Sequence, residues 1–212
     1  MSNLDNKKGL IIDLRNNPGG LLNQALGTLD MFISDGKLLS EKGRTSRNNQ
    51  TWYAHSSGTY SKIPIVILVN GGSASASEIV SGAMQDHKRA IIVGEKTFGK
   101  GSVQAIIPIN KEEAVRLTIA RYYLPSGRTI QAVGVTPDIK VVPAKVTPIK
   151  NLGIDIKESE LKAHLKAELQ KIDHKKKIIK SKKEKYKKID GDNQLQTAVD
   201  ILKALIIEKE TK

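Results

Sequence analysis

The chain contains no cysteine among its 212 residues, which excludes disulfide bonds and cysteine-ligated metal sites. No apolar run approaches the length of a membrane-spanning helix. Residues 1–8 are polar and lack the apolar stretch of a signal peptide. The four histidines are scattered without metal-ligand spacing (His55, His87, His164, His174). The sequence therefore predicts no resident metal or other cofactor, and we expect no signal peptide at residues 1–8.

Positive charge is in excess, with a formal net charge of +13, and much of it gathers near the C-terminus. The segment Lys171–Lys188 holds three lysine clusters against only Asp173 and Glu184. Such a run can mark a surface for nucleic acid or anionic membranes, but it is also typical of a solvated helical face or a linker. Tyr186 is its only aromatic residue, so it offers little for base stacking. We expect no nucleic-acid partner.

Apolar runs alternate with helical patterns over residues 1–142, and this alternation predicts an α/β domain with a mixed sheet. A strand–Gly-rich turn–helix unit occurs twice. Strands are expected at 9–14, 63–69, 90–93, 102–109, 114–124 and 139–142, and helices at 21–33 and from the serine cluster to 86. The run at 63–69 is continuously apolar, which is typical of a strand that is buried on both faces.

The composition changes beyond residue 142. Residues 143–190 form a lysine-rich segment, helical or flexible, that includes a possible amphipathic helix at 158–172. Residues 191–212 carry a second amphipathic helix, whose stripe of Leu195, Leu202 and Leu205 could pack against another subunit. We therefore expect three parts: a core, a lysine-rich segment and a helical C-terminal tail.

A cluster of three serines, Ser73, Ser75 and Ser77, follows an Asn-Gly-Gly turn and precedes a helix. This arrangement places a hydroxyl at a helix N-terminus, where free backbone N–H groups favour developing negative charge. A structural explanation is also available, because Ser75 and Glu78 have the spacing of a capping box. Composition alone does not choose among the three serines.

Lys100 lies between two glycines downstream of this cluster. A serine hydroxyl needs a base to become a nucleophile, and lysine is the base in Ser–Lys variants of serine catalysis. Free lysine, with a pKa of ~10.4, is protonated at neutral pH, whereas burial favours the neutral amine. We expect apolar neighbours such as Phe98 and Val103 to bury this amine, and Gln104 to orient it without adding charge. The alternative is an ordinary hairpin turn.

Residues 94–100 also match the first seven positions of the phosphate-binding loop GxxxxGK. The next position should be serine or threonine to hold magnesium, but it is Gly101. The loop should also open a helix, whereas the residues from Ser102 onward have a strand pattern. Both requirements fail, which argues against nucleotide binding.

Four segments together resemble the signature blocks of the carboxyl-terminal processing peptidases, also called tail-specific proteases. They are GLIIDLRNNPGG, VNGGSASASE, GEKTFGKGSVQ and GVTPDI, and they stand in the family's order and at its spacing. The resemblance implies that Ser75 is the nucleophile, Lys100 the general base and Gln104 the orienting third member. It also implies that the backbone N–H groups of Gly20 and Ala76 form the oxyanion hole. The implied fold is a spiral α/β core similar to ClpP and crotonase.

The resemblance further implies protein substrates with exposed C-terminal tails and a periplasmic or cell-envelope location for the parent protein. In the family, a signal sequence, N-terminal helices and a PDZ domain precede the first block, which this chain reaches at Gly9. We therefore expect a serine endopeptidase core without the PDZ domain. The alternatives are a non-catalytic pseudo-protease or assembly module that forms homo-oligomers through its C-terminal helices, and a polyanion-binding protein.

Overall fold

The computed structural model of the chain describes Leu4 and residues 7–45, 49–56, 59–60, 62–144 and 191–211. Two compact units divide the chain, the first made of 1–144 with 192–212 and the second of 145–191. The helix expected at 158–172 and the lysine-rich run at 171–188 lie outside the described residues. No helix in the described ranges is long and apolar enough to span a membrane.

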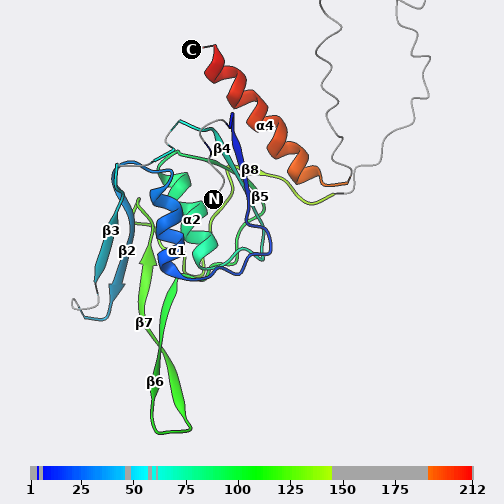
Figure 1. The fold of residues 1–212 in the computed structure, drawn as a ribbon. Helices are drawn as coiled ribbons and strands as arrows, with labels where there is room; N and C mark the ends of the chain where they lie inside the picture. Colours follow the sequence, from blue (N-terminus) through cyan, green and yellow to red (C-terminus); the bar gives the residue numbers. More distant parts are fainter. Residues whose placement is uncertain are drawn as a thin grey trace, which may run out of the picture. The chain divides into compact units, whose positions relative to one another are not determined.

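The first unit contains a four-stranded parallel sheet in the order β1-β4-β5-β8 (Figure 1). Its strands are β1 (Leu10–Asp13), β4 (Ile65–Val69), β5 (Ile91–Gly94) and β8 (Ile139–Lys140). Parallel neighbours need crossover connections, and helices α1 (Leu22–Asp30) and α2 (Ala76–Asp86) lie on these connections. Both strand–turn–helix units predicted from the sequence are present, and each turn lies at the carboxyl end of its strand.

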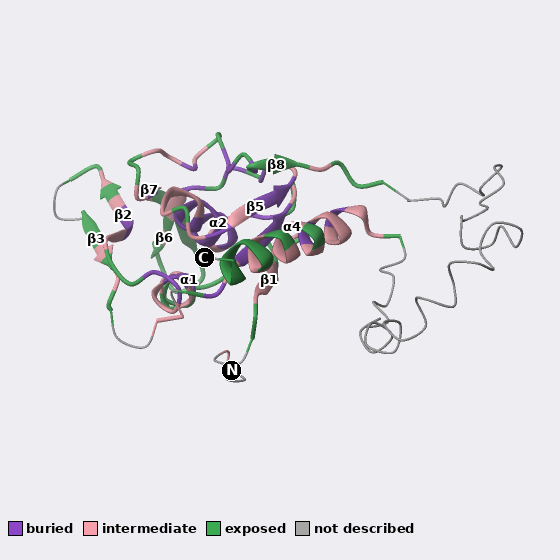
Figure 2. Ribbon diagram, turned by 90° about the horizontal axis from the view of Figure 1, so that it is seen from above, coloured by how far each residue is buried: buried purple, intermediate pink, exposed green. Residues whose placement is uncertain are grey.

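Strand β4 is buried along its whole length, as the sequence predicts, because both faces of the sheet are covered (Figure 2). Ile65, Ile67 and Val69 belong to the core shared with α1 and α2. The alternate residues Val66 and Leu68 pack with Ala198 of helix α4 (Asn193–Glu210). The period of two along a strand assigns successive side chains to opposite faces.

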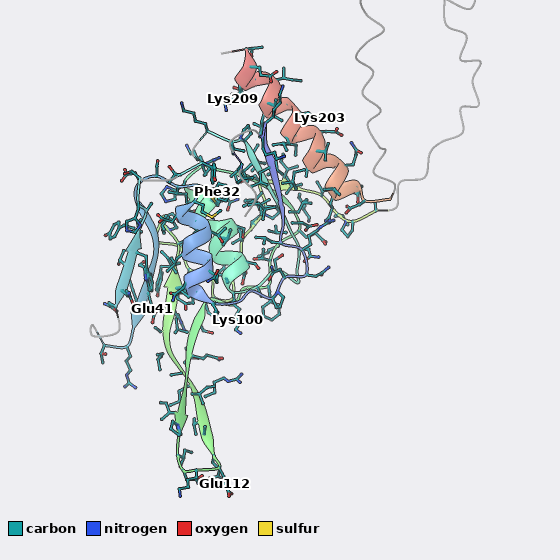
Figure 3. All side chains as sticks on the ribbon, in the orientation of Figure 1. Phe32, Glu41, Lys100, Glu112, Lys203 and Lys209 are labelled. Atoms are coloured by element: carbon teal, nitrogen blue, oxygen red, sulfur yellow. The ribbon has the colours of Figure 1, made fainter. Side chains whose placement is uncertain are left out.

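A second sheet is antiparallel, in the order β3-β2-β7-β6. It consists of β2 (Lys37–Gly43), β3 (Gln50–Tyr53), β6 (Ser102–Pro108) and β7 (Ala114–Tyr123). The outer half of the β6–β7 hairpin projects from the core, with Glu112 at its tip and Lys100 at its base (Figure 3). The alternation in β7 predicted a half-exposed strand, but Val115 and Leu117 of its apolar face are also exposed, because no other element covers this part of the ribbon among the described residues.

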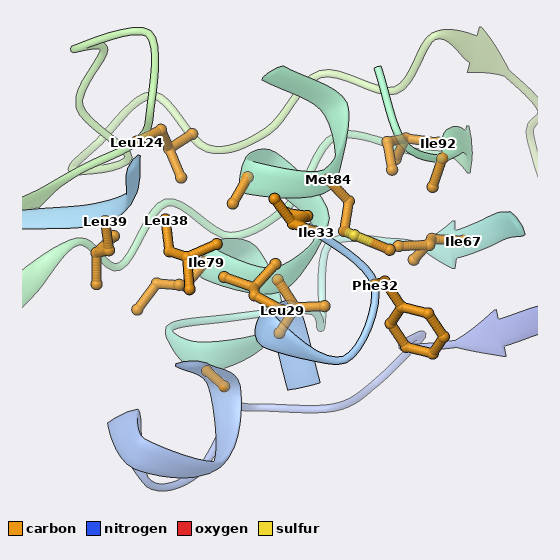
Figure 4. Close-up of a cluster of buried hydrophobic side chains, with 14 of the residues drawn as sticks. Leu29, Phe32, Ile33, Leu38, Leu39, Ile67, Ile79, Met84, Ile92 and Leu124 are labelled. Carbon is orange, nitrogen blue, oxygen red and sulfur yellow. The ribbon is translucent and has the colours of Figure 1, made fainter. Parts of the chain in front are cut away.

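The main core lies between α1, α2 and the parallel sheet (Figure 4). Leu29 of α1 and Ile79 and Met84 of α2 are almost fully buried, together with Ile67 of β4. On α2 the pairs Ile79/Ala83 and Val80/Met84 are each four residues apart, which is the spacing of one broad helix face, so the two helices bury their apolar faces in one cluster. This packing fixes where the N-terminus of α2 lies relative to β1 and β4.

Helix α4 covers the other face of the parallel sheet. Leu195, Leu202 and Leu205 pack against the cluster formed by β4, β5 and Ala198. A Cβ on Gly9 would lie 2.8 Å from Leu202, so the helix approaches the start of β1 closely. This leucine stripe of α4 therefore packs against the chain's own sheet and not against another subunit. Formation of homo-oligomers stays a prediction, and it would need a different surface.

Candidate active site

Ser75 stands at the N-cap of α2 with φ 55° and ψ −114°. A positive φ is uncommon for a residue with a Cβ, and this combination lies outside the left-handed helical region. Strain of this kind persists only where the surrounding structure fixes it, and it is concentrated at functional sites. The turn places Ser75, which is partly exposed, at the free N–H groups of the helix.

The turn after β1 packs directly against this helix start. A Cβ on Gly19 (φ 95°) would lie 2.6 Å from the Ala74 carbonyl oxygen and 2.7 Å from the Ala76 nitrogen. Only glycine allows such an approach at this backbone angle. A Cβ on the next residue, Gly20, would meet nothing within 4 Å. The two residues predicted to supply the oxyanion hole, Gly20 and Ala76, therefore come from two turns that touch, and the space over Gly20 is open.

The structure distinguishes the three serines, which composition could not. Ser73 and Ser77 are buried, and their hydroxyls donate to the backbone carbonyls of Leu14 (2.7 Å) and Asn17 (3.0 Å). Both of these hydroxyls tie the serine turn to the turn after β1. Ser75, by contrast, is only partly buried, and its hydroxyl takes no part in these two contacts.

Glu78 does more than the capping box predicted. Its side chain is fully buried, and Oε2 accepts the Ser75 N–H at 2.9 Å, as the box requires. The same oxygen accepts the Lys100 N–H at 2.8 Å. The other oxygen, Oε1, accepts the Gly99 N–H at 2.7 Å and the Thr97 hydroxyl at 2.5 Å. The sequence shows only the first of these four contacts, because the other three donors lie about twenty positions downstream.

Lys100 is brought to the serine turn through its backbone. Its N–H and that of Ser75 bind the same Glu78 oxygen, so the two backbones lie within two hydrogen-bond lengths of each other. The side chain, however, is exposed, and Phe98 is 68% exposed. The expected burial of the Lys100 amine is therefore wrong for this structure, because Gly99 and Gly101 face the interior and the lysine between them faces solvent.

Gln104 lies on β6 opposite Thr118 of β7, next to a register shift in the ladder. Its side chain is exposed, and no hydrogen bond within the described ranges joins it to Ser75 or Lys100. Its role as the orienting residue stays a prediction.

Arg15, which opens the turn after β1, is the centre of a charged cluster. Its guanidinium donates to Asp13 at 2.6 Å, to Asp192 at 2.8 Å and to the Gln194 side chain at 3.1 Å. Hydrogen bonds from Arg15 are the main cause of a lowered pKa at both Asp13 and Asp192. These contacts join the turn to the start of α4. Within the described part of the chain no group of acidic or histidine side chains could hold a metal ion.

The profile of peptidase family S41 matches residues 1–141. The chain belongs to peptidase family S41. The carboxy-terminal-processing protease of Bartonella bacilliformis is 49% identical over 162 residues, which are 76% of this chain and 37% of that protein. The carboxyl-terminal-processing protease of Synechocystis is 38% identical over 130 residues, covering 61% of this chain and 30% of the relative. The resemblance seen in the four sequence blocks is confirmed.

A solved family S41 structure has the same fold. The photosystem II D1 C-terminal processing protease superimposes with a TM-score of 0.59 at 39% identity, over 64% of this chain and 35% of that chain. The α/β fold with a C-terminal helix is thus confirmed as a family S41 protease fold. The chain spans about a third of the length of these relatives. The chloroplastic C-terminal processing peptidase of Tetradesmus obliquus is similarly 38% identical over 146 residues, which are 69% of this chain and 31% of that protein. This chain belongs to a family of carboxy-terminal processing serine proteases.

Proposed function

We propose that this chain carries a Ser–Lys endopeptidase site that cleaves polypeptides near their C-termini. The observation that supports it best is the Glu78 carboxylate, which holds the backbones of Ser75 and Lys100 on one oxygen atom. A lysine side chain is long enough to reach back over two hydrogen-bond lengths. Contacts between catalytic groups are often loose without substrate and tighten when it binds.

In the proposed reaction Ser75 Oγ attacks the scissile carbonyl carbon while Lys100 Nζ, as the neutral amine, takes the hydroxyl proton. The carbonyl oxygen becomes an oxyanion, which the N–H groups of Gly20 and Ala76 bind. Lys100 then gives the proton to the leaving amine, the C–N bond breaks and an acyl-enzyme remains. Water attacks this ester, with Lys100 again passing the proton, and releases the new C-terminus. In the free chain Lys100 is exposed to solvent. A substrate polypeptide lying over Lys100 would shield its amine from water.

Residues 1–142 would form the catalytic core in this proposal, with residues 143–190 and 191–212 as the lysine-rich segment and the C-terminal helix. We infer that the substrates are proteins with exposed C-terminal tails, because the named relatives are C-terminal processing proteases. We also infer a periplasmic or envelope location for the parent protein.

Cleavage of a reporter protein with an unstructured apolar tail tests the site. We expect Ser75→Ala and Lys100→Ala to reduce the cleavage rate at least about 10³-fold, since both groups act in one step. Lys100→Arg should be equally inactive, because the guanidinium keeps its charge and cannot accept a proton. Lys96→Ala is the matched control, since it removes a lysine from an exposed position of the same loop. Cleavage that persists in the Ser75 or Lys100 variants, or that is absent from the unmodified chain, would contradict the proposal.

A further inference from the structure

The hydrogen bonds between β1 and β4 continue beyond the last residues of both strands. The Leu14 N–H donates to the Leu68 carbonyl at 2.9 Å. Bonds in a parallel ladder are evenly spaced, so the next one would join the Asn16 N–H to the Asn70 carbonyl. That carbonyl points into the following turn, where it accepts the Ser73 N–H at 2.9 Å. The Asn16 N–H donates instead to the side-chain Oδ1 of Asn70 at 2.9 Å, so this side chain supplies the bond that its own backbone does not make.

The side-chain amide of Asn70 makes two further contacts. Its Oδ1 also accepts the Gly72 N–H at 3.0 Å, which is an Asx turn. Its Nδ2 donates to the Asn16 side-chain oxygen at 3.0 Å. Because Oδ1 accepts two backbone N–H groups, the amide has one orientation, and Nδ2 must face Asn16. Asn16 has φ 55°, an angle that asparagine adopts more readily than most residues.

The amide of Asn70 thus joins the two turns that carry the proposed oxyanion hole. The turn after β1 holds Gly20, and the turn after β4 leads to Ala76 at the start of α2. On their buried side these turns are joined by the Ala74 N–H, which donates to the Asn17 carbonyl at 3.0 Å. Asn70 ties them on the more exposed side. Contacts on one side alone would let one turn rotate against the other, whereas catalytic groups must keep their places to within about 0.5 Å.

We infer that Asn70 is a positioning residue, which sets the separation of the Gly20 and Ala76 N–H groups by joining their two turns. The inference rests on the proposed function for the role of these N–H groups, but the connection between the turns is a separate property. An oxyanion needs both N–H groups far more than a bound substrate does. Loss of the amide should therefore lower kcat and change KM little.

Cleavage of the reporter protein by Asn70 variants tests the inference. We expect Asn70→Ala to lower kcat about 10²-fold and to change KM by less than about threefold. Asn70→Asp keeps both acceptor bonds, and the Asn16 amide can turn to donate to the carboxylate, so its kcat should stay within about tenfold of the unmodified chain. An unchanged kcat in Asn70→Ala, or an Asn70→Asp variant as slow as Asn70→Ala, would overturn the inference.

Asn110→Ala is the matched control, because the Asn110 amide makes the same set of bonds at the tip of the β6–β7 hairpin. Its Oδ1 accepts the N–H groups of Glu112 and Glu113 at 2.9 Å, and its Nδ2 donates to the Glu113 side chain at 2.8 Å. The tip projects away from Lys100 at the base of the hairpin (Figure 3). Loss of these bonds should leave kcat unchanged, and a fall as large as in Asn70→Ala would contradict the inference.

Loss of three hydrogen bonds can also prevent folding, so Asn16→Gly provides a second variant. Glycine adopts φ 55° without strain and keeps the backbone N–H that Asn70 accepts, while the bond from Nδ2 is lost. We expect kcat to fall about tenfold, as the loss of one hydrogen bond allows. A kcat equal to that of the unmodified chain would show that this bond does not position the site.

A measurement without cleavage separates the inference from the proposed function. The backbone amide signals of Gly20 and Ala76 are followed by NMR in the full chain. Both should shift or broaden in Asn70→Ala and stay in place in Asn110→Ala. Such changes in a chain that never cleaves would leave Asn70 assigned and the endopeptidase proposal wrong. Cleavage at the full kcat in Asn70→Ala, with both signals in place, would do the opposite.

Discussion

Glu78 is the residue at which the serine turn and the lysine loop meet. A buried carboxylate must be hydrogen-bonded, because its desolvation is otherwise very costly. Here each oxygen accepts two donors, and the N-terminus of α2 adds a favourable dipole. The same four contacts hold Ser75 in its strained backbone conformation and fix the loop that carries Lys100. The stability of the fold and the proposed catalysis therefore depend on one side chain.

Replacing Glu78 by Gln should weaken both the stability of the fold and the proposed cleavage. The amide keeps one acceptor oxygen and places an NH₂ group against N–H donors, which leaves buried donors unsatisfied. We expect the free energy of unfolding to fall by about 2–4 kcal/mol, as measured by urea denaturation, and cleavage to be lost at temperatures where the variant is folded.

Glu95→Gln is the control for this substitution, since Glu95 is only partly buried in the same loop. Its effect on unfolding should stay within about 0.5 kcal/mol. A Glu78→Gln variant that is folded and cleaves at the full rate would show that the four contacts do not position the site.

At the scale of elements, Arg15 links β1, the turn after it and the start of α4. Asp192 is also the N-cap of α4, and its side chain accepts the Leu195 N–H at 2.9 Å. The guanidinium thus binds a helix cap on one side and Asp13 at the end of β1 on the other. Bidentate Arg–carboxylate pairs are stronger than most surface ion pairs, although both carboxylates here are partly exposed and screened by solvent.

This cluster predicts a specific acid sensitivity. The pKa values of Asp13 and Asp192 are lowered in the folded chain from their ordinary value of 3.8. The unfolded chain therefore binds these protons first, so the stabilisation is complete above about pH 4 and is lost as the pH falls below it. We expect Arg15→Met to make the fall in the free energy of unfolding at acid pH (the acid limb) less steep. The same variant should lower the free energy of unfolding at pH 7 by about 1–2 kcal/mol. Urea denaturation at a series of pH values measures both effects.

Arg44→Met serves as the comparison, because Arg44 is exposed on the surface. It should leave the acid limb as steep as in the unmodified chain. The same steepness in Arg15→Met would mean that other carboxylates cause the acid sensitivity.

At the scale of the whole molecule, the start of α4 is hydrogen-bonded to the residues just before Lys145. Asn193 accepts the Ala144 N–H at 2.8 Å and donates to the Val142 carbonyl at 2.8 Å. Gln194 donates to the Val141 carbonyl at 2.7 Å. Ala144 and Asn193 therefore lie side by side in the first unit, so a short connection could join these two positions.

Replacing residues 146–189 by a short Gly/Ser linker should therefore leave the first unit folded. Loop length changes the closure entropy only slowly, so we expect the free energy of unfolding to stay within about 1–2 kcal/mol of the full chain. Thermal and urea unfolding measure this. In the full chain, Asn193→Ala should cost about 1–2 kcal/mol through its two lost hydrogen bonds. Loss of folding on linker replacement would show that the first unit needs the segment.

The sequence by itself determined the local elements and the family. Hydrophobic periodicity located the strands and helices of the core, because a strand or helix with a buried face must repeat apolar residues with its own period. The continuously apolar run at 63–69 correctly indicated a strand covered on both sides. Turn chemistry at 15–20 and 70–75 located the two loops of the site, since glycine and asparagine adopt backbone angles that other residues avoid.

Only the tertiary structure decided which residues meet. No local pattern shows that Gly19 touches the start of α2, that Glu78 reaches the loop at 97–100, or that the leucine stripe of α4 covers the chain's own sheet. Lys100 has apolar neighbours along the chain, whereas the fold turns its side chain to solvent. The physical reason is the same in each case: contacts between residues distant in sequence are set by how the helices and sheets pack, and short-range propensity carries no record of that packing.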